Sequence, residues 1–347
     1  MKKLFIFAAL AFGLAACETK NEESIDAVVN GDKAVEFTIN VVAPEAEETR
    51  AADWSNSAAG AISNGLLGTP DDNVTLRYIL EIYDAAGRPS SERYIQYSDD
   101  RNVSFNPRLI PDRNYTFVVW ADIVTRSAEG QPWGNNLYNV GAISEDTPSG
   151  QLRSVTINAD NWKPMDEMRD AYTGFVTDNL DGTHDIKVTL TRPFAKLRVV
   201  TEDMAAVNAL GVVPTKAKIV YTTPYRIEFN AMTGTYTAAD DANKKTHDTF
   251  EIANYDSNVA GVSKALFTDY FFADTNGTDK VGFTMEVYDG ADELIKATEF
   301  TTDIPVKRNT LTTITGKFLT VQDGNYAIKV EVSNDGDFAT PEIVENR

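Results

Sequence analysis

Apolar and polar residues alternate along much of the chain, which is the pattern of β-strands that bury one face. In residues 34–42 the alternation places Val35, Phe37, Ile39 and Val41 on one face. Asn-Gly and Asp-Gly pairs separate several of the later apolar stretches. These stretches are residues 74–83, 115–120, 186–190, 217–221, 265–272, 281–288, 298–301, 310–318 and 326–332. Helical periodicity is short and is clearest in residues 204–210. The pattern predicts a mostly β protein built from β-sandwiches.

Two short patterns occur once in each half of the chain, in the same order. Residues 80–84 (Leu-Glu-Ile-Tyr-Asp) correspond to residues 285–289 (Met-Glu-Val-Tyr-Asp). Residues 110–114 correspond to residues 304–309, and each of these segments precedes another expected strand. The shared order predicts a duplicated β unit.

The expected boundary between two domains lies at Pro193. This proline interrupts the apolar run 186–200, and proline cannot donate a hydrogen bond to a sheet. We therefore expect an N-terminal β-sandwich over residues 51–192. A C-terminal β-sandwich is expected over residues 193–347.

The first residues have the layout of a signal peptide. Two lysines follow Met1, residues 4–16 carry no charge, and the uncharged run stops at Cys17. As a helix this run would rise only ~20 Å, against a hydrocarbon core of ~30 Å, so it is too short to span a membrane. The prediction is a cleaved signal peptide over residues 1–16.

Cys17 is the only cysteine in the chain and lies at the expected cleavage point. Residues 14–17 (Leu-Ala-Ala-Cys) resemble a bacterial lipobox, in which the cysteine sulfur receives a diacylglyceryl group and the new amino terminus is acylated. The alternative is an ordinary secretory signal with an incidental cysteine. Several acyl chains hold a membrane firmly. Cys17 is therefore the expected lipidation site, which would place a lipid anchor at the cell outer membrane with the folded part exposed at the surface.

The chain is strongly acidic, with a formal net charge of −20. No run of lysine and arginine interrupts this balance, so nucleic acid and anionic lipid surfaces are poor partners. Residues 18–26 are polar and acidic, which is typical of a tether, and they resemble the surface-export signal of Bacteroidetes lipoproteins.

Residues 44–50 form a second polar linker, directly after the first expected strand. Arg50 is its only basic residue, and an arginine-specific protease could cut between Arg50 and Ala51. Residues 17–50 would then be a lipidated tether with a removable first strand, whose loss would open a groove for an extended segment. The last expected strand, with Ile328, Val330 and Val332 on one face, could donate that segment to a neighbouring subunit. The alternative is a permanent first strand and an uncut Arg50.

This order of parts resembles the fimbrillins of Bacteroidetes, the type V pilins derived from lipoproteins. Three internal phrases add to the resemblance: residues 169–172 (Arg-Asp-Ala-Tyr), residues 190–197 (Leu-Thr-Arg-Pro-Phe-Ala-Lys-Leu), and residues 308–310 leading into 313–316. The resemblance implies two tandem transthyretin-like β-sandwich domains, removal of the first strand after Arg50, and assembly with other fimbrial subunits by strand exchange for adhesion. Residues 333–347 are more polar than a stalk donor requires, so an accessory, tip, anchor or non-polymerising role stays open.

Candidate chemistry is sparse. His184 and His247 lie far apart in polar segments, and both are expected at the surface. No nucleophile, zinc or phosphate-binding motif is present, so we expect a protein that is not an enzyme and that binds no metal and no cofactor. Residues 178–185 and 274–279 are oxygen-rich like calcium loops, but their composition also suits hairpin turns.

The main alternative function is that of an outer-membrane surface glycan-binding lipoprotein. Such a protein needs exposed aromatic platforms, and Trp54, Trp133 and Trp162 lie in loop-like segments that could supply them. Tryptophans in such loops also commonly cap the core of a sandwich. Trp120 ends an apolar strand and is expected in the core.

Overall fold

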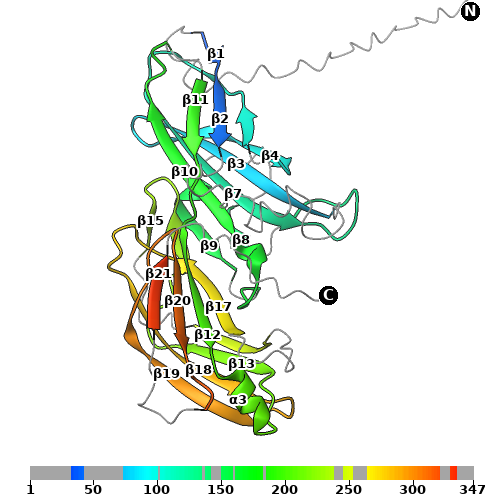
Figure 1. The fold of residues 1–347 in the computed structure, drawn as a ribbon. Helices are drawn as coiled ribbons and strands as arrows, with labels where there is room; N and C mark the ends of the chain where they lie inside the picture. The colour runs from blue at the N-terminus through cyan, green and yellow to red at the C-terminus, as the bar shows by residue number, and fades with distance from the viewer. Residues whose placement is uncertain are drawn as a thin grey trace, which may run out of the picture.

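A computed structural model describes residues 33–42, 73–100, 102–134, 137–141, 150–158, 161–182, 185–237, 245–252, 264–320 and 329–333. The described part is mostly β, with one α-helix, α3 (Met204–Ala209), and two 3-10 turns, η1 (Gln151–Ser154) and η2 (Glu167–Arg169). Figure 1 shows two lobes stacked end to end, with the first strands in the upper lobe and α3 at the far end of the lower one. The expected mostly β sandwich architecture is confirmed.

Two sheets build the upper lobe. The larger is antiparallel, and its strands in spatial order are β10 (Ala171–Asp178), β7 (Tyr115–Thr125), β3 (Val74–Asp84) and β4 (Pro89–Ser98). The smaller consists of β11 (Asp185–Thr189), β2 (Thr38–Val42) and β5 (Asn102–Phe105). A short ladder joins β1 (Val35–Glu36) to β6 (Arg108–Leu109). Alternating apolar side chains of both sheets meet in one buried cluster, which is the core of this lobe.

The lower lobe also contains two four-stranded sheets. The first has the order β17 (Lys264–Phe272), β12 (Phe194–Thr201), β20 (Leu311–Gly316) and β21 (Lys329–Ser333), with β12 and β20 parallel. The second has the order β16 (Thr246–Glu251), β13 (Lys216–Tyr221), β18 (Lys280–Tyr288) and β19 (Leu294–Pro305). Aromatic side chains dominate the core between them; Phe283, for example, stacks on Phe300 with ring centroids 4.5 Å apart.

A further small sheet lies where the lobes meet. Its order is β15 (Thr235–Tyr236), β14 (Glu228–Asn230), β9 (Val155–Ile157) and β8 (Tyr138–Asn139). β8 and β9 precede residue 192, whereas β14 and β15 follow it. The division at residue 192 stays a prediction, and the two halves of the chain are tied together by hydrogen bonds across it.

The repeated sequence pattern forms the same hairpin turn twice. After β3, the carboxylate of Asp84 accepts hydrogen bonds from the backbone N–H groups two and four residues ahead, at 2.9 and 2.8 Å. After β18, Asp289 accepts the equivalent two bonds, at 2.8 and 2.9 Å. The strands that follow the second repeated pattern differ, because β7 pairs with β3 whereas β20 lies in the sheet opposite β18. The duplication therefore extends over the hairpin and not over the third strand.

Candidate functional site

The first strand occupies the centre of a sheet. β2 lies between β11, to which it is parallel, and β5, to which it is antiparallel. Figure 1 shows it beside β11 in the upper lobe. Ile39 is in register with Phe105 on one side and with Ile186 on the other. Both edges of β2 are therefore hydrogen-bonded, although it is the earliest strand of its sheet in the sequence.

The apolar face of this segment is deeply buried. Phe37 is 1% exposed, and Ile39 and Val41 are fully buried, while Val35 is half-buried at the end of the ladder with β6. All of them contact the core of the upper lobe. Full burial of a large apolar side chain contributes ~1.5–3 kcal/mol. The first strand thus contributes several kilocalories per mole to the stability of this lobe.

The polar face of β2 makes weaker contacts. Thr38 donates to Asn106 at 3.3 Å, and Ser104 donates to Asn40 at 2.8 Å, both in exposed positions. Loss of the strand would leave the facing edges of β5 and β11 without partners, and a slot between them lined by apolar side chains. An unpaired pair of strand edges is a binding site for an extended chain segment.

The last described strand is held differently. β21 lies at the edge of its sheet and pairs only with β20. Val330 is 38% exposed and Val332 is 47% exposed, so the apolar face of this strand is largely open to solvent. Figure 1 shows β21 on the outside of the lower lobe. Its main-chain hydrogen bonds, rather than burial of its side chains, hold it in place.

Several predicted site residues lie outside the described part of the chain. They are Cys17, Arg50, Ala51, Trp54, His184 and Ile328.

Residues 169–172, 190–197 and 308–310, which are far apart in the sequence, meet where the lobes join. Arg192 forms a buried ion pair with Asp170, with its Nε 2.8 Å from Oδ1, and it also donates to the Tyr172 hydroxyl at 2.7 Å. Arg308 donates from its Nε to the carbonyl oxygen of Arg192 at 3.0 Å. The backbone N–H of Asn309 donates to the carbonyl of Phe194 at 2.6 Å. These three segments therefore form a structural connection where the lobes meet, which we call the joint.

Arg308 connects this joint to the small sheet. Besides Arg192, it donates to the carbonyl oxygen of Gly234 at 3.1 Å, in the turn between β14 and β15. Its guanidinium also lies 5.1 Å from the ring centroid of Phe229. Burial lowers the pKa of Arg308 to about 10, and the negative charge of Asp274 partly opposes this change. The side chain stays cationic at neutral pH and holds two strand connections together.

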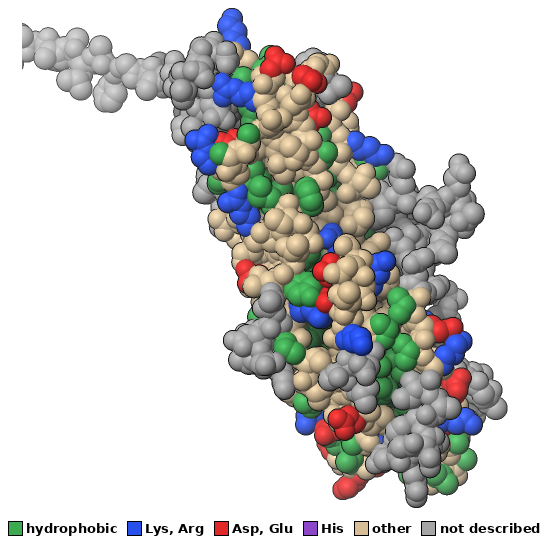
Figure 2. Space-filling view, turned by 90° about the vertical axis from the view of Figure 1, so that its left-hand side faces the viewer, with side chains coloured by type: hydrophobic (Ala, Val, Ile, Leu, Met, Phe, Trp, Pro, Cys, Tyr) green, Lys and Arg blue, Asp and Glu red, His purple; other side chains and the backbone are tan. Residues whose placement is uncertain are grey.

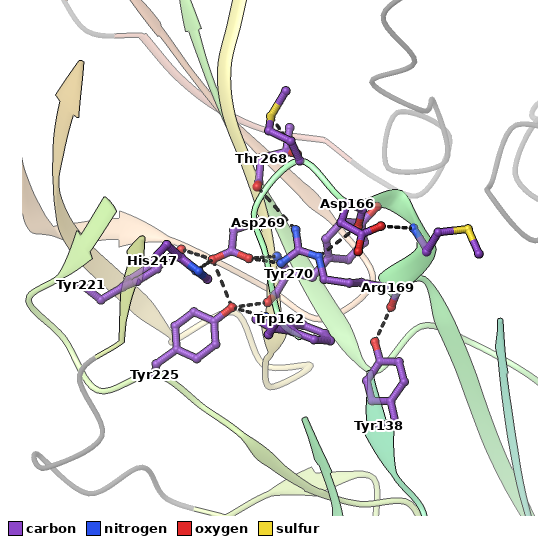
Figure 3. Close-up of polar contacts among 12 residues, drawn as sticks. Tyr138, Trp162, Asp166, Arg169, Tyr221, Tyr225, His247, Thr268, Asp269 and Tyr270 are labelled. Atoms are coloured by element: carbon purple, nitrogen blue, oxygen red, sulfur yellow. Dashed lines mark hydrogen bonds and ion pairs between the residues drawn. The ribbon is translucent and has the colours of Figure 1, made fainter. Parts of the chain in front are cut away.

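The expectation of a surface His247 is wrong. This residue is 2% exposed, because it lies on the inward face of β16, and its ring contacts Asp269 of β17 at 2.8 Å. Figure 3 shows it pointing into the lower lobe toward that carboxylate. The surrounding residues 245–249 are mostly polar, so they suggest a turn. The pairing of β16 with β13 places His247 opposite Ile219 on the inward face, while Thr246, Asp248 and Thr249 are exposed.

Asp269 is the centre of a buried polar network (Figure 3). Its carboxylate pairs with Arg169 and accepts hydrogen bonds from Tyr221 at 2.8 Å and Tyr225 at 3.1 Å. Burial acts to raise the pKa of Asp269, but His247 and Arg169 outweigh it and hold the pKa well below its usual range. The carboxylate is fully buried. A substrate cannot reach it, so the network stabilises the core.

A family profile covers nearly the whole chain. The profile of a family of unknown function, DUF6562, matches residues 28–345. The chain belongs to DUF6562. No curated protein matches the sequence.

Solved structures of Bacteroidetes proteins align with most of this DUF6562 chain. A candidate cell-adhesion protein from Bacteroides eggerthii is 12% identical, with a TM-score of 0.47, and the alignment covers 88% of this chain and 98% of that one. A candidate polysaccharide-binding protein from Bacteroides thetaiotaomicron is 11% identical, with a TM-score of 0.46 and coverages of 86% and 98%. The fimbrial anchor protein Mfa2 from Porphyromonas gingivalis is 10% identical, with a TM-score of 0.41 and coverages of 86% and 98%.

The described tryptophans of this DUF6562 chain are packed against other side chains. Trp120 is fully buried, as expected. Trp162 is 2% exposed and donates to the Tyr225 hydroxyl at 2.7 Å, so it caps the core of the lower lobe. Trp133 is half-buried and stacks on Tyr97, with ring centroids 5.8 Å apart. The described loop tryptophans, Trp133 and Trp162, therefore pack against protein side chains.

The described carboxylates of the two oxygen-rich loops bind groups of the protein itself. The carboxylate of Asp279 binds Arg226 at 3.2 Å and accepts a hydrogen bond from Tyr236 at 2.7 Å. In the other loop, Asp178 accepts a hydrogen bond from the backbone N–H of Leu180 at 2.7 Å. Within the described ranges, no group of three or more His, Cys, Asp or Glu side chains is arranged to hold a metal ion.

Among the residues that the structure describes, no helix has both the length and the apolar character needed to cross a membrane.

Proposed function

We propose that this protein is a fimbrial subunit or fimbrillin-like surface lipoprotein whose first strand fills a slot that another strand can take. Cys17 would carry the lipid that anchors the exported chain in the outer membrane. Cutting after Arg50 would release that lipid together with β2. A second subunit would then supply the replacement strand, and head-to-tail exchange would extend a fibre for adhesion.

The position of β2 is the single observation that carries the proposal. A first strand in the centre of a sheet, followed by a linker with one arginine, can be removed by one cut. The chain that remains would still contain both neighbours of the slot, β5 and β11. A permanent first strand would need no such linker, although it could tolerate one.

The character of β21 supports the donor role. Val330 and Val332 alternate with Lys329 and Glu331, as Ile39 and Val41 alternate with polar residues in β2. Because the valines of β21 are largely exposed in its present position, moving them into a buried slot would gain apolar burial. Ile328 would extend the same face.

Two arrangements follow from this proposal, and they differ at the amino terminus. A polymerising subunit would begin at Ala51 and carry no lipid. An anchor, tip or accessory protein would keep the lipid on Cys17 and retain β2. Among the aligned proteins, Mfa2 is a fimbrial anchor protein and Mfa3 is a tip fimbrial protein.

Limited proteolysis of the folded protein tests the proposal. The substrate is the chain from residue 17 with Cys17→Ser, treated with an arginine-specific protease, and products are followed by amino-terminal sequencing and size-exclusion chromatography. We expect a new terminus at Ala51, loss of residues 33–42 from the folded product, and growth of polymers. The R50A variant is the matched control and should remain uncut there and monomeric.

A cut product that stays monomeric and keeps β2 bound would contradict the strand-exchange mechanism. A chain ending before Tyr326 tests the donor separately. It should be cut as before but form no polymers, and polymers that persist would exclude β21 as the donor. Sequencing of the protein on the native cell surface then distinguishes a subunit, which starts at Ala51, from a lipidated anchor, which starts at Cys17.

A further inference from the structure

An open groove crosses the outer face of the lower lobe, away from the first strand. Its volume is 650 Å³, and it lies over β13, β16 and β18. Lys216 of β13 is in register with Glu251 of β16 on one side and with Tyr288 of β18 on the other. Directly paired residues share one face of a sheet, so these side chains form a row across three strands. Small-molecule sites have volumes of about 300–1,000 Å³, a range that includes this groove.

The groove carries more carboxylates than ammonium groups. Lys216 forms an ion pair with Asp292 at 2.6 Å, and Lys218 forms one with Glu286 at 3.2 Å. Asp248 and Glu251 of β16 add two exposed carboxylates beside these pairs. The groove thus presents hydrogen-bond donors and acceptors close together, with a small excess of negative charge. Figure 2 shows acidic and basic side chains likewise interspersed on one face of the molecule.

An apolar strip borders the polar row. The Tyr288 hydroxyl donates to Glu286 at 2.6 Å, two residues earlier on the same face, so its ring extends back along β18. On the next strand, Leu294 is in register with Tyr288 and is 54% exposed. A flat aromatic ring and an exposed aliphatic side chain together offer an apolar surface beside charged hydrogen-bonding groups.

We infer that this groove is a binding site for a neutral polysaccharide. A sugar ring has one apolar face of C–H groups, which can lie on Tyr288 and Leu294. Its rim of hydroxyls can each donate to a carboxylate and accept from an ammonium group. Glu251 and Asp248 would accept hydrogen bonds from hydroxyls, and Lys216 would donate to them. Binding would need no metal and no movement of the sheet.

The charge pattern selects against anionic ligands. An anionic polymer would face three carboxylates and a chain with a net charge of −20. A neutral polyol avoids this repulsion and uses both kinds of group. The inference is independent of strand exchange, because the groove residues belong to β13, β16, β18 and the turn after β18.

Affinity electrophoresis tests the inference with soluble polysaccharides as probes. The neutral probes are mannan, galactomannan, xyloglucan and glycogen, and the anionic probes are polygalacturonate and heparin. We expect at least one neutral probe to retard the protein. Tyr288→Ala should weaken that binding about tenfold or more, which corresponds to ~1.4 kcal/mol. Tyr288→Phe should stay within about twofold, because the ring and not the hydroxyl provides the platform.

Phe175→Ala is the matched control, since Phe175 is an aromatic residue that is 49% exposed on β10 of the other lobe. It should leave the retardation unchanged. Glu251→Gln is a second variant, which tests the proposed hydrogen bonds from sugar hydroxyls to this carboxylate. It should weaken binding while the protein remains folded, as checked by circular dichroism. Retardation by anionic probes only, retardation that survives Tyr288→Ala, or no retardation by any neutral probe would each overturn the proposed site. None of these results depends on cleavage after Arg50.

Discussion

The guanidinium of Arg192 binds both carboxylate oxygens of Asp170, with Nε 2.8 Å from Oδ1 and Nη2 3.0 Å from Oδ2. Both side chains are almost fully buried where the lobes meet. In such a place a charge that loses its partner cannot regain water. Two apolar residues in these positions could be as stable as the ion pair. Once the pair is present, however, removal of either partner destabilises the protein.

Removing one partner should destabilise the protein strongly. We expect Arg192→Ala to lower the free energy of unfolding by about 3–5 kcal/mol, because Asp170 would remain buried and unpaired. Urea unfolding followed by tryptophan fluorescence measures the change. The control is Arg88→Ala, which breaks an ion pair with Asp84 whose arginine is 75% exposed. That pair should contribute less than about 1 kcal/mol, and equal losses in the two variants would contradict this account.

Gly174 marks a close approach between the sheets of the upper lobe. A Cβ there would lie 2.2 Å from the carbonyl oxygen of Thr189. Gly174→Ala should therefore force the β10 and β11 backbones apart. We expect this to lower the free energy of unfolding by about 1–3 kcal/mol. Gly290→Ala, where a Cβ meets nothing within 4 Å, should change the stability little. Thermal unfolding of both variants tests this, and a wild-type melting temperature for Gly174→Ala would refute the close approach.

We expect burial of Phe37 to be a main contribution to the binding of the first strand in the upper lobe. In the uncut protein, Phe37→Ala should cost about 3–5 kcal/mol through the lost burial and the cavity. Thr38→Ala, on the polar face of the same segment, should stay within about 0.5 kcal/mol. Urea unfolding measures both. After cleavage and release of residues 33–42, the wild type and Phe37→Ala should unfold identically; a persisting difference would mean that the strand has stayed bound.

We expect the protein to lose stability in acid, because the buried carboxylate of Asp269 becomes protonated. Its pKa in the folded protein is depressed below the ordinary value of 3.8, so the unfolded chain binds this proton more readily. The stabilising effect is then fully present above pH ~4 and declines as the pH falls below that value. Unfolding free energies measured between pH 2.5 and 6 should decrease toward acid in the wild type, and less steeply in Asp269→Asn. The Asn variant should also be less stable at pH 6, because Arg169 loses its anionic partner.

Local patterns located about half of the described strands and did not locate others, such as β10 and β16. Alternation located β3, β11, β13, β17, β18 and β20 to within a few residues, and the first half of β7, because a strand with one buried face must alternate. It also identified the buried face of Phe37, Ile39 and Val41. The Asp84 and Asp289 turns were detectable as a repeat, since the same short-range hydrogen bonds need the same residue type.

His247 shows where local pattern was insufficient. Its neighbours Thr246, Asp248 and Thr249 are polar and exposed, so nothing in the segment indicates a buried face. The signal that could have found it lies elsewhere in the chain, in the single aspartate of the apolar stretch 264–272. A buried carboxylate requires partners, and both Arg169 and His247 approach it from distant segments.

The sequence by itself determined about half of the strands, which face of the first one is apolar, and where the tether, the cysteine and the arginine lie along the chain. Only the tertiary structure decided that β2 lies between β5 and β11, that residues 169–172, 190–197 and 308–310 form one joint, and that β21 remains at an exposed edge. The reason is physical. Side-chain periodicity is a local property, whereas backbone hydrogen bonds between strands carry almost no sequence information. The choice of partner therefore depends on how all the buried faces pack at once.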